Sequence, residues 1–326
     1  RVGDMGDQAE GDENKFWLAP DGVPAIRLDG FLRQCLPHLS RQELHRAIAE
    51  NFFLLNGRVA RKGDRVNGGD RLTFIGPAAL LAKTPPPARQ LEIPIIYEDD
   101  SILAVDKPAG MATHGFSGRD GATLANFLPA HWPEILHVGT SRWEPGLVHR
   151  LDIETSGVVL IAKTQAAFDS LRQQFRGREV KKVYLALVWG APLERGTIEL
   201  ALAHDRGASR QKAPERQPAR SSDRRMWRAV THYRLVASAR RMSLLEVVME
   251  TGVTHQIRVH LSSSGYPIVG DTLYGADYPE SFGLARHFLH ARSLTLRHPA
   301  RRQPLTINAE LAVELREVLQ RIEMPV

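Results

Sequence analysis

Val148-His149-Arg150-Leu151-Asp152-Ile153-Glu154-Thr155-Ser156-Gly157-Val158-Val159-Leu160 is the most specific stretch of this 326-residue sequence. An apolar residue leads into a basic pair and a single aspartate, Thr155-Ser156-Gly157 turns the chain, and a buried strand follows. This order predicts that Asp152 lies in a loop held between two elements, where a rigid carboxylate can face a cleft. The alternative is more common for a loop aspartate: a cap or turn residue with no chemical role.

A second stretch, residues 251–261, alternates polar and apolar side chains, which predicts a strand over residues 254–261. Arg258 then projects from the polar face, where it could pair with a buried carboxylate and favour its ionised form. His149, His255 and His260 are more simply explained as structural histidines than as metal ligands, because no helical His spacing accompanies them.

The remaining apolar runs predict more strands than helices, and the two do not alternate regularly. An α+β fold with a mixed sheet therefore fits better than a doubly wound fold. Expected strands cover residues 93–97, 102–105, 158–162, 183–188 and 243–248; expected helices cover 28–36, 41–48, 122–127, 166–175 and 309–322.

Composition shifts divide the chain. Residues 1–22 are acidic and poor in hydrophobics, which predicts a disordered tail. Residues 23–76 read as a small α/β module with a hairpin turn at Asn56-Gly57, and residues 77–92 as a Pro-rich linker. Residues 93–326 form the second domain, within which residues 204–228 are expected to be a basic mobile loop.

The net charge of +6 is concentrated in two places. Residues 23–80 carry nine basic and five acidic side chains, and residues 204–228 carry eight and three. Clustered arginine predicts a polyanion partner, with a solubilising surface bias as the alternative. The lone Cys35 excludes a disulfide framework and Cys-rich zinc sites. No Walker loop or Gly-x-Gly-x-x-Gly motif is present, so we expect no nucleotide cofactor.

No apolar run of about 20 residues is present, which predicts no membrane span. The first 22 residues have no apolar core of the kind a secretory signal needs. We therefore expect a cytoplasmic protein, acting as a monomer, with no membrane partner.

Five motifs together carry a family resemblance. His149-Arg150-Leu151-Asp152 with Thr155-Ser156-Gly157 resembles the signature of the RluA-type pseudouridine synthases. Residues 97–110, 182–188, 254–275 and 290–299 resemble that family's other motifs in the same order. The resemblance implies a mixed central sheet cut by an active-site cleft. It also implies isomerisation of uridine to pseudouridine in RNA, without cofactor or metal.

The resemblance also implies residue roles. Asp152 would be the catalytic carboxylate, either attacking C1′ of the ribose or helping to form a glycal-like intermediate. Arg258 would keep it ionised, and Tyr184 would stack on the target base. Arg150 would enter the RNA stack that the flipped uridine leaves. The remaining expected substrate-binding residues of this domain are His149, Ile257 and Leu289.

The N-terminal block is similar to the S4 RNA-binding module, which implies that Arg33, Arg41 and Arg46 face RNA phosphates. Val253 stands where the family usually has arginine, which removes one expected contact. An S4-like module with this catalytic domain favours large-subunit (23S) ribosomal RNA as target, and residues 113–118 look more like the C-type branch. The alternatives are a tRNA-directed synthase and a non-catalytic RNA-binding or ribosome-assembly factor.

Overall fold

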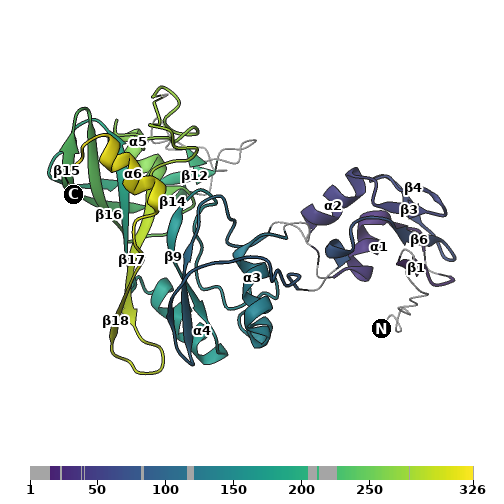
Figure 1. Cartoon of the computed structure of the whole chain (residues 1–326). Helices are drawn as coiled ribbons and strands as arrows, with labels where there is room; N and C mark the ends of the chain where they lie inside the picture. Colours follow the sequence, from purple (N-terminus) through teal and green to yellow (C-terminus); the bar gives the residue numbers. More distant parts are fainter. Residues whose placement is uncertain are drawn as a thin grey trace. The chain divides into compact units, whose positions relative to one another are not determined.

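A computed structural model describes residues 15–22, 24–37, 39, 41–81, 84–115, 121–204, 211–212, 226–278 and 280–325. The chain divides near Pro86 into a small N-terminal unit and a large unit (Figure 1). Each has a hydrophobic core of its own. The two units are therefore described separately.

The small unit combines two helices with short strands. Its helices are α1 (Leu28–Cys35) and α2 (Arg41–Ala49). Its main sheet has the order β1 (Phe16–Leu18), β6 (Arg71–Phe74), β3 (Phe53–Leu55) and β4 (Arg58–Val59), and β2 (Ile26–Arg27) pairs with β5 (Arg65–Val66). Asn56 and Gly57 have φ values of 50° and 83°. Two positive φ values are what a two-residue hairpin turn needs, so the predicted hairpin is confirmed.

Two boundaries of this unit differ from the prediction. β1 lies within the segment 1–22 that was expected to be disordered, and it pairs with β6 while burying Trp17. The apolar run Phe16-Trp17-Leu18 explains why this end of the segment is ordered; residues 1–14 lie outside the described residues. The expected linker 77–92 contains a short helix, η1 (Ala78–Leu81), whose Leu80 is buried in the small core.

The large unit is built on a mixed sheet, as predicted. Its order is β11-β15-β16-β10-β17-β9-β8-β7, with β18 paired to β17. Only β9 and β17 pair in parallel within it. The strands are β7 (Ile95–Glu98), β8 (Ile102–Lys107), β9 (Ser156–Ala162), β10 (Lys181–Trp189), β11 (Arg195–Glu199), β15 (Val230–Ala239), β16 (Met242–Met249), β17 (Leu289–Arg297) and β18 (Pro304–Asn308).

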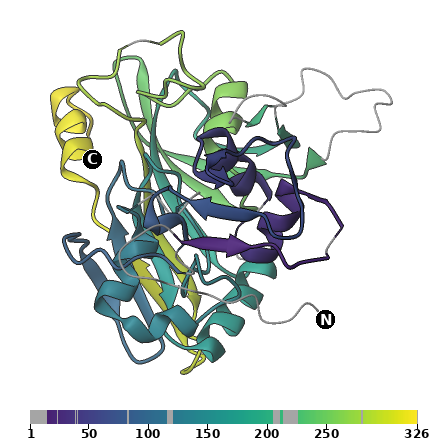
Figure 2. The ribbon, with the colours of Figure 1, turned by 90° about the vertical axis from the view of Figure 1, so that its right-hand side faces the viewer.

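Four α-helices and a second small sheet surround these strands. The helices are α3 (Leu124–His131), α4 (Gln165–Arg176), α5 (Gln256–Ser263) and α6 (Val313–Arg321), with the 3-10 helix η2 (Pro133–His137). In the turned view, the yellow α6 lies along one side of the large unit (Figure 2). The small sheet joins β12 (Leu202–His204), β13 (Gln211–Lys212) and β14 (Met226–Trp227). β13, β14 and the last residue of β12, His204, fall in the expected mobile loop 204–228, so these parts of the segment are paired strands; residues 205–210 and 213–225 lie outside the described residues.

The strand predicted over residues 254–261 is wrong, because this segment forms α5. His255 precedes the helix with φ 57°, a left-handed conformation that turns the chain. The helix is buried all round over Gln256–Leu261. A helix without an exposed face shows no 3.6-residue polarity pattern, so the alternation of residue types there carried no structural information.

Gly157 fixes how closely the two parallel strands approach. It has φ 115°, and a Cβ atom there would lie 2.3 Å from the carbonyl oxygen of Ala291 on β17. Only glycine fits this contact, which sets the place where β9 starts and therefore where the preceding loop with Asp152 lies.

Candidate active site

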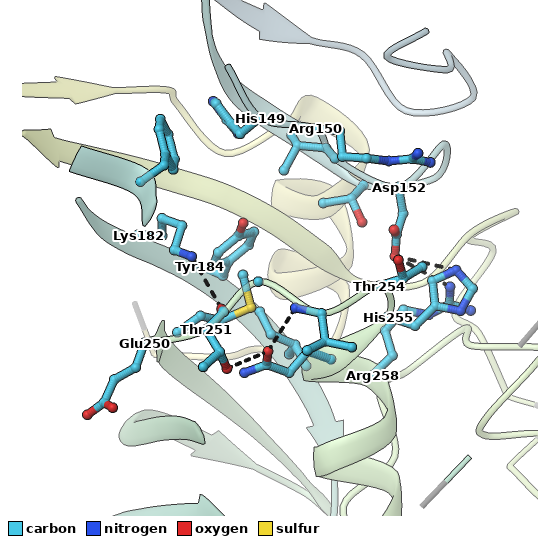
Figure 3. Close-up of a pocket in the computed structure, with 18 of the residues that line it drawn as sticks. His149, Arg150, Asp152, Lys182, Tyr184, Glu250, Thr251, Thr254, His255 and Arg258 are labelled. Atoms are coloured by element: carbon cyan, nitrogen blue, oxygen red, sulfur yellow. Dashed lines mark hydrogen bonds and ion pairs between the residues drawn. The ribbon is translucent and has the colours of Figure 1, made fainter. Parts of the chain in front are cut away.

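A pocket of about 560 Å³ opens on the large unit. Its walls come from residues 148–155, from the end of α4, from β10, from the chain between β16 and α5, from the start of α5, and from Leu289 on β17. Figure 3 shows Asp152, Tyr184, His255 and Arg258 pointing into the same space from these different elements. The fold thus brings together residues separated by more than 100 positions in the sequence.

Asp152 lies in a loop clamped from two sides. Thr113 exchanges two hydrogen bonds with the backbone of Leu151: its hydroxyl donates to the carbonyl at 3.0 Å and accepts from the amide at 3.1 Å. The fully buried Lys107 donates to the carbonyl oxygen of Ile153 at 3.1 Å. The carboxylate between these anchors is 22 % exposed. It is therefore fixed in position yet open to the pocket.

Arg258 connects two carboxylates. Its Nη1 lies 3.7 Å from Oδ2 of Asp152. Its Nε and Nη2 donate to the two oxygens of Asp271 at 2.7 and 2.8 Å. Burial raises the pKa of Asp271, but the hydrogen bonds and charge of Arg258 outweigh it, so the pKa of Asp271 is lowered. The prediction that Arg258 pairs with a buried carboxylate is confirmed, with Asp271 as the tighter partner.

Two site residues were not predicted. Asp271 also accepts hydrogen bonds from the amides of Leu273 and Tyr274, each at 3.0 Å. Nε2 of His255 lies 3.9 Å from Asp152, and its Nδ1 lies 2.9 Å from the Tyr274 hydroxyl. Burial is the main reason why the pKa of His255 is lowered, which favours a neutral imidazole. Both residues stand within the 254–275 motif, so their place in a motif was the available signal.

Tyr184 forms the floor of the pocket between Lys182 and the Asp152–Arg258 pair (Figure 3). It is 6 % exposed. Burial first, and the charge of Asp152 second, raise the pKa of its phenol, so the hydroxyl stays protonated at neutral pH. Ile257 and Leu289 also line the pocket as buried apolar side chains. Tyr184, Ile257 and Leu289, the three aromatic or apolar residues predicted for the site, thus line the same pocket.

His149 and Arg150 lie on the pocket wall with different surroundings. Nε2 of His149 accepts a hydrogen bond from the amide of Leu160 at 2.9 Å, and its ring stacks on Phe175. Burial lowers the pKa of His149 to about 3, so it is neutral at pH 7. Arg150 is exposed, with Nη1 3.0 Å from Nε2 of His114. His149 therefore has a structural partner, whereas Arg150 presents its guanidinium at the surface.

Val253 is half-buried in the pocket wall, and its amide donates to the side chain of Gln256 at 3.1 Å. Gln256 also donates to Val230 O and Thr231 Oγ1, at 3.0 Å each. Val253 packs beside the small cluster that includes Leu202. The apolar residue in place of the expected arginine is thus accommodated by packing.

The predicted arginines Arg33, Arg41 and Arg46 belong to the small unit and do not line this pocket. All three are exposed on α1 and α2. Arg46 pairs with Glu50 at 3.2 Å, and Arg41 lies 3.6 Å from Asp29.

In the part of the chain that the structure describes, no three His, Cys, Asp or Glu side chains are grouped so that they could hold a metal ion. Within the same residues, no helix has the length and apolar character needed to cross a bilayer.

Comparison with known proteins gives a consistent result. Residues 101–263 match the family model described as RNA pseudouridylate synthase. A Chloroflexus aurantiacus protein named as an uncharacterized RNA pseudouridine synthase is 39 % identical, over 95 % of this chain and 94 % of that protein. The ribosomal large subunit pseudouridine synthase D of Xanthomonas campestris is 35 % identical, over 93 % of this chain and 90 % of that protein.

Among solved structures, human RNA pseudouridylate synthase domain containing 4 superimposes with a TM-score of 0.58 at 27 % identity. The match covers 72 % of this chain and 94 % of the human chain.

Proposed function

This chain belongs to the RNA pseudouridylate synthase family and is an RNA pseudouridine synthase, and from that premise we propose that it modifies large-subunit ribosomal RNA through Asp152. The single observation that carries the role of Asp152 is its position at a pocket with Arg258 3.7 Å away and Tyr184 beneath. The target class is supported by the names of relatives such as the Xanthomonas campestris enzyme. Those names favour the D-type over the C-type branch that residues 113–118 predict.

The reaction rearranges bonds without adding or removing atoms. The N1–C1′ bond of uridine breaks, the base turns, and a C5–C1′ bond forms while C5 loses a proton and N1 gains one. Asp152 acts on the ribose, and the guanidinium of Arg258 stabilises its negative charge. The neutral phenol of Tyr184 supports the face of the base, and its protonated hydroxyl is a second group of the pocket that can take part in proton movement.

The uridine must leave its stack before it can reach Asp152. Arg150, exposed two residues earlier on the same loop, is suited to the vacated space because a planar guanidinium stacks as well as pairs. The small unit would add S4-like phosphate contacts through Arg33, Arg41 and Arg46 on its two helices. Replacing these three by glutamine is expected to weaken RNA binding most at low salt.

The deciding experiment compares Asp152→Asn with the exposed Asp277→Asn as a matched control. Each variant is returned to a strain that lacks the gene, and pseudouridine is mapped in its 23S ribosomal RNA and tRNA. We expect wild type and Asp277→Asn to restore the missing pseudouridines, and Asp152→Asn to fold but restore none. Activity in Asp152→Asn would refute the role of the carboxylate. Restoration in tRNA alone would refute the target class.

A further inference from the structure

A second group of cations lines the pocket away from Asp152. Arg172 and Arg176 lie on α4, Arg178 follows the helix, and Lys182 lies near the start of β10. Lys182 and Tyr184 are two residues apart on the strand, so their side chains share one face, about 6.6 Å apart along it. Figure 3 shows the Lys182 ammonium on the side of Tyr184 opposite to the Asp152–Arg258 pair.

These cations have few protein partners. Arg172 donates to the carbonyl oxygen of Val148 at 3.1 Å, and Lys182 donates to that of Thr251 at 3.2 Å. Among the described residues, no carboxylate lies within ion-pair distance of any of the four. Glu250 also lines the pocket; its Oε1 lies 2.8 Å from Nε2 of His232, and the charge of Arg178 is among the causes that lower the Glu250 pKa. Within the described residues, the four side chains on this wall thus carry positive charge that no direct ion pair neutralises.

The spacing of these arginines does not favour the stability of α4. Arg172 and Arg176 stand four residues apart on α4, and like charges at that spacing destabilise a helix. The helix dipole favours Arg176 in the last turn. Arg178 follows with φ 61°, and the amides of Arg178 and Glu179 donate to the carbonyl oxygens of Phe175 and Gln174. This is the left-handed C-terminal cap of a helix, where glycine is the usual residue, so the cap itself does not call for an arginine.

We propose that Arg172, Arg176, Arg178 and Lys182 form a phosphate track that holds the RNA strand running on from the target uridine. The backbone phosphates are the ligand, because an array of separate cations matches a repeating charge better than one base edge. The track explains why the pocket extends well beyond the space near Asp152. This inference rests on the proposed function, since the strand it holds is the one that presents the uridine.

The test uses the full-length chain carrying Arg176→Gln and Arg178→Gly. Arg178→Gly removes the charge while relieving the left-handed strain, so this position is not expected to destabilise the fold. The control carries Arg195→Gln and Arg240→Gly. Arg240 is also an exposed arginine with positive φ, 56°, and Arg195 is exposed, and neither lines the pocket. Both double variants lose two positive charges.

Binding to an unmodified 23S ribosomal RNA transcript is measured from 50 to 200 mM salt, in the Asp152→Asn background so that no turnover occurs. Each lost phosphate contact lowers the slope of log K against log salt by about 1. The affinity gap between the track variant and the control should therefore narrow by about 16-fold over this fourfold salt range. With active enzyme, KM rises by a larger factor than any fall in kcat.

A track variant whose salt slope equals that of the control overturns the inference, even if wild type makes pseudouridine normally. A reduced slope supports it, even if pseudouridine mapping refutes the proposed target or the role of Asp152. Melting curves of both variants ensure that folded proteins are compared.

Discussion

Replacing Asp271 by alanine tests whether this aspartate holds Arg258 in place for Asp152. The Asp271 side chain is 1 % exposed and that of Arg258 is 9 % exposed, and two hydrogen bonds of 2.7 and 2.8 Å join them. The alanine variant leaves the buried guanidinium without its bidentate partner. Breaking a buried pair in this way costs about 3–5 kcal/mol of the free energy of unfolding. In a unit of this size that corresponds to a fall in Tm of roughly 6–20 °C.

The same substitution should impair the reaction at temperatures where the protein remains folded. Arg258 would keep its 3.7 Å contact with Asp152 and its place over the Tyr274 ring, but would lose its bidentate anchor and shift toward Asp152. A displacement of about 1 Å at a reacting group can lower the rate by roughly 10²-fold. Asp271→Asn keeps an oxygen for the amides of Leu273 and Tyr274 but loses the charge, so its stability should be intermediate.

The pH dependence gives an independent check. The pKa of Asp271 is lowered in the folded protein, so its ion pair stabilises the fold above the ordinary aspartate value of about 4 and is lost as the pH falls through the lowered value. The stability deficit of Asp271→Ala should therefore shrink below about pH 4.

The assay is urea unfolding of wild type, Asp271→Ala and the exposed control Asp277→Ala, with pseudouridine formation measured alongside. A deficit within about 0.5 kcal/mol of the control would refute the reasoning, because surface substitutions already vary that much.

Three further predictions concern the same framework. The pKa of His149 is about 3 in the folded protein, so between pH 5 and 6.5 only the unfolded chain takes up a proton at this residue. The free energy of unfolding of wild type should therefore rise by about 1.4 kcal/mol per pH unit over this range from His149 alone. His149→Gln should flatten that rise, as measured by urea midpoints. Gly157→Ala should lower the free energy of unfolding by on the order of 4 kcal/mol, whereas Gly110→Ala, with positive φ but open space, should cost about 1–2. Arg258→Lys keeps the charge but loses the bidentate fork, so kcat should fall while the secondary structure seen by circular dichroism is unchanged.

The loop around Asp152 was predictable from sequence because its signals are local. A basic pair, a single aspartate, a turn and a buried strand occur within 13 residues, and the structure has the loop and β9 in that order. The mixed sheet was predictable for a related reason, since each strand is an apolar run. The partners across the pocket were harder: Asp271 is separated from Asp152 by more than 100 residues, and no local pattern marks a carboxylate as buried.

Arg258 shows how a correct inference can survive a wrong secondary structure. The strand interpretation placed Arg258 on a polar face, but in α5 its neighbours are buried on every side. The inference that Arg258 pairs with a carboxylate did not depend on the strand, because a buried guanidinium needs a carboxylate partner in a helix as much as in a strand. That requirement is met first by Asp271 and then by Asp152, so the guanidinium beside Asp152 is held by a residue that no strand register would have indicated.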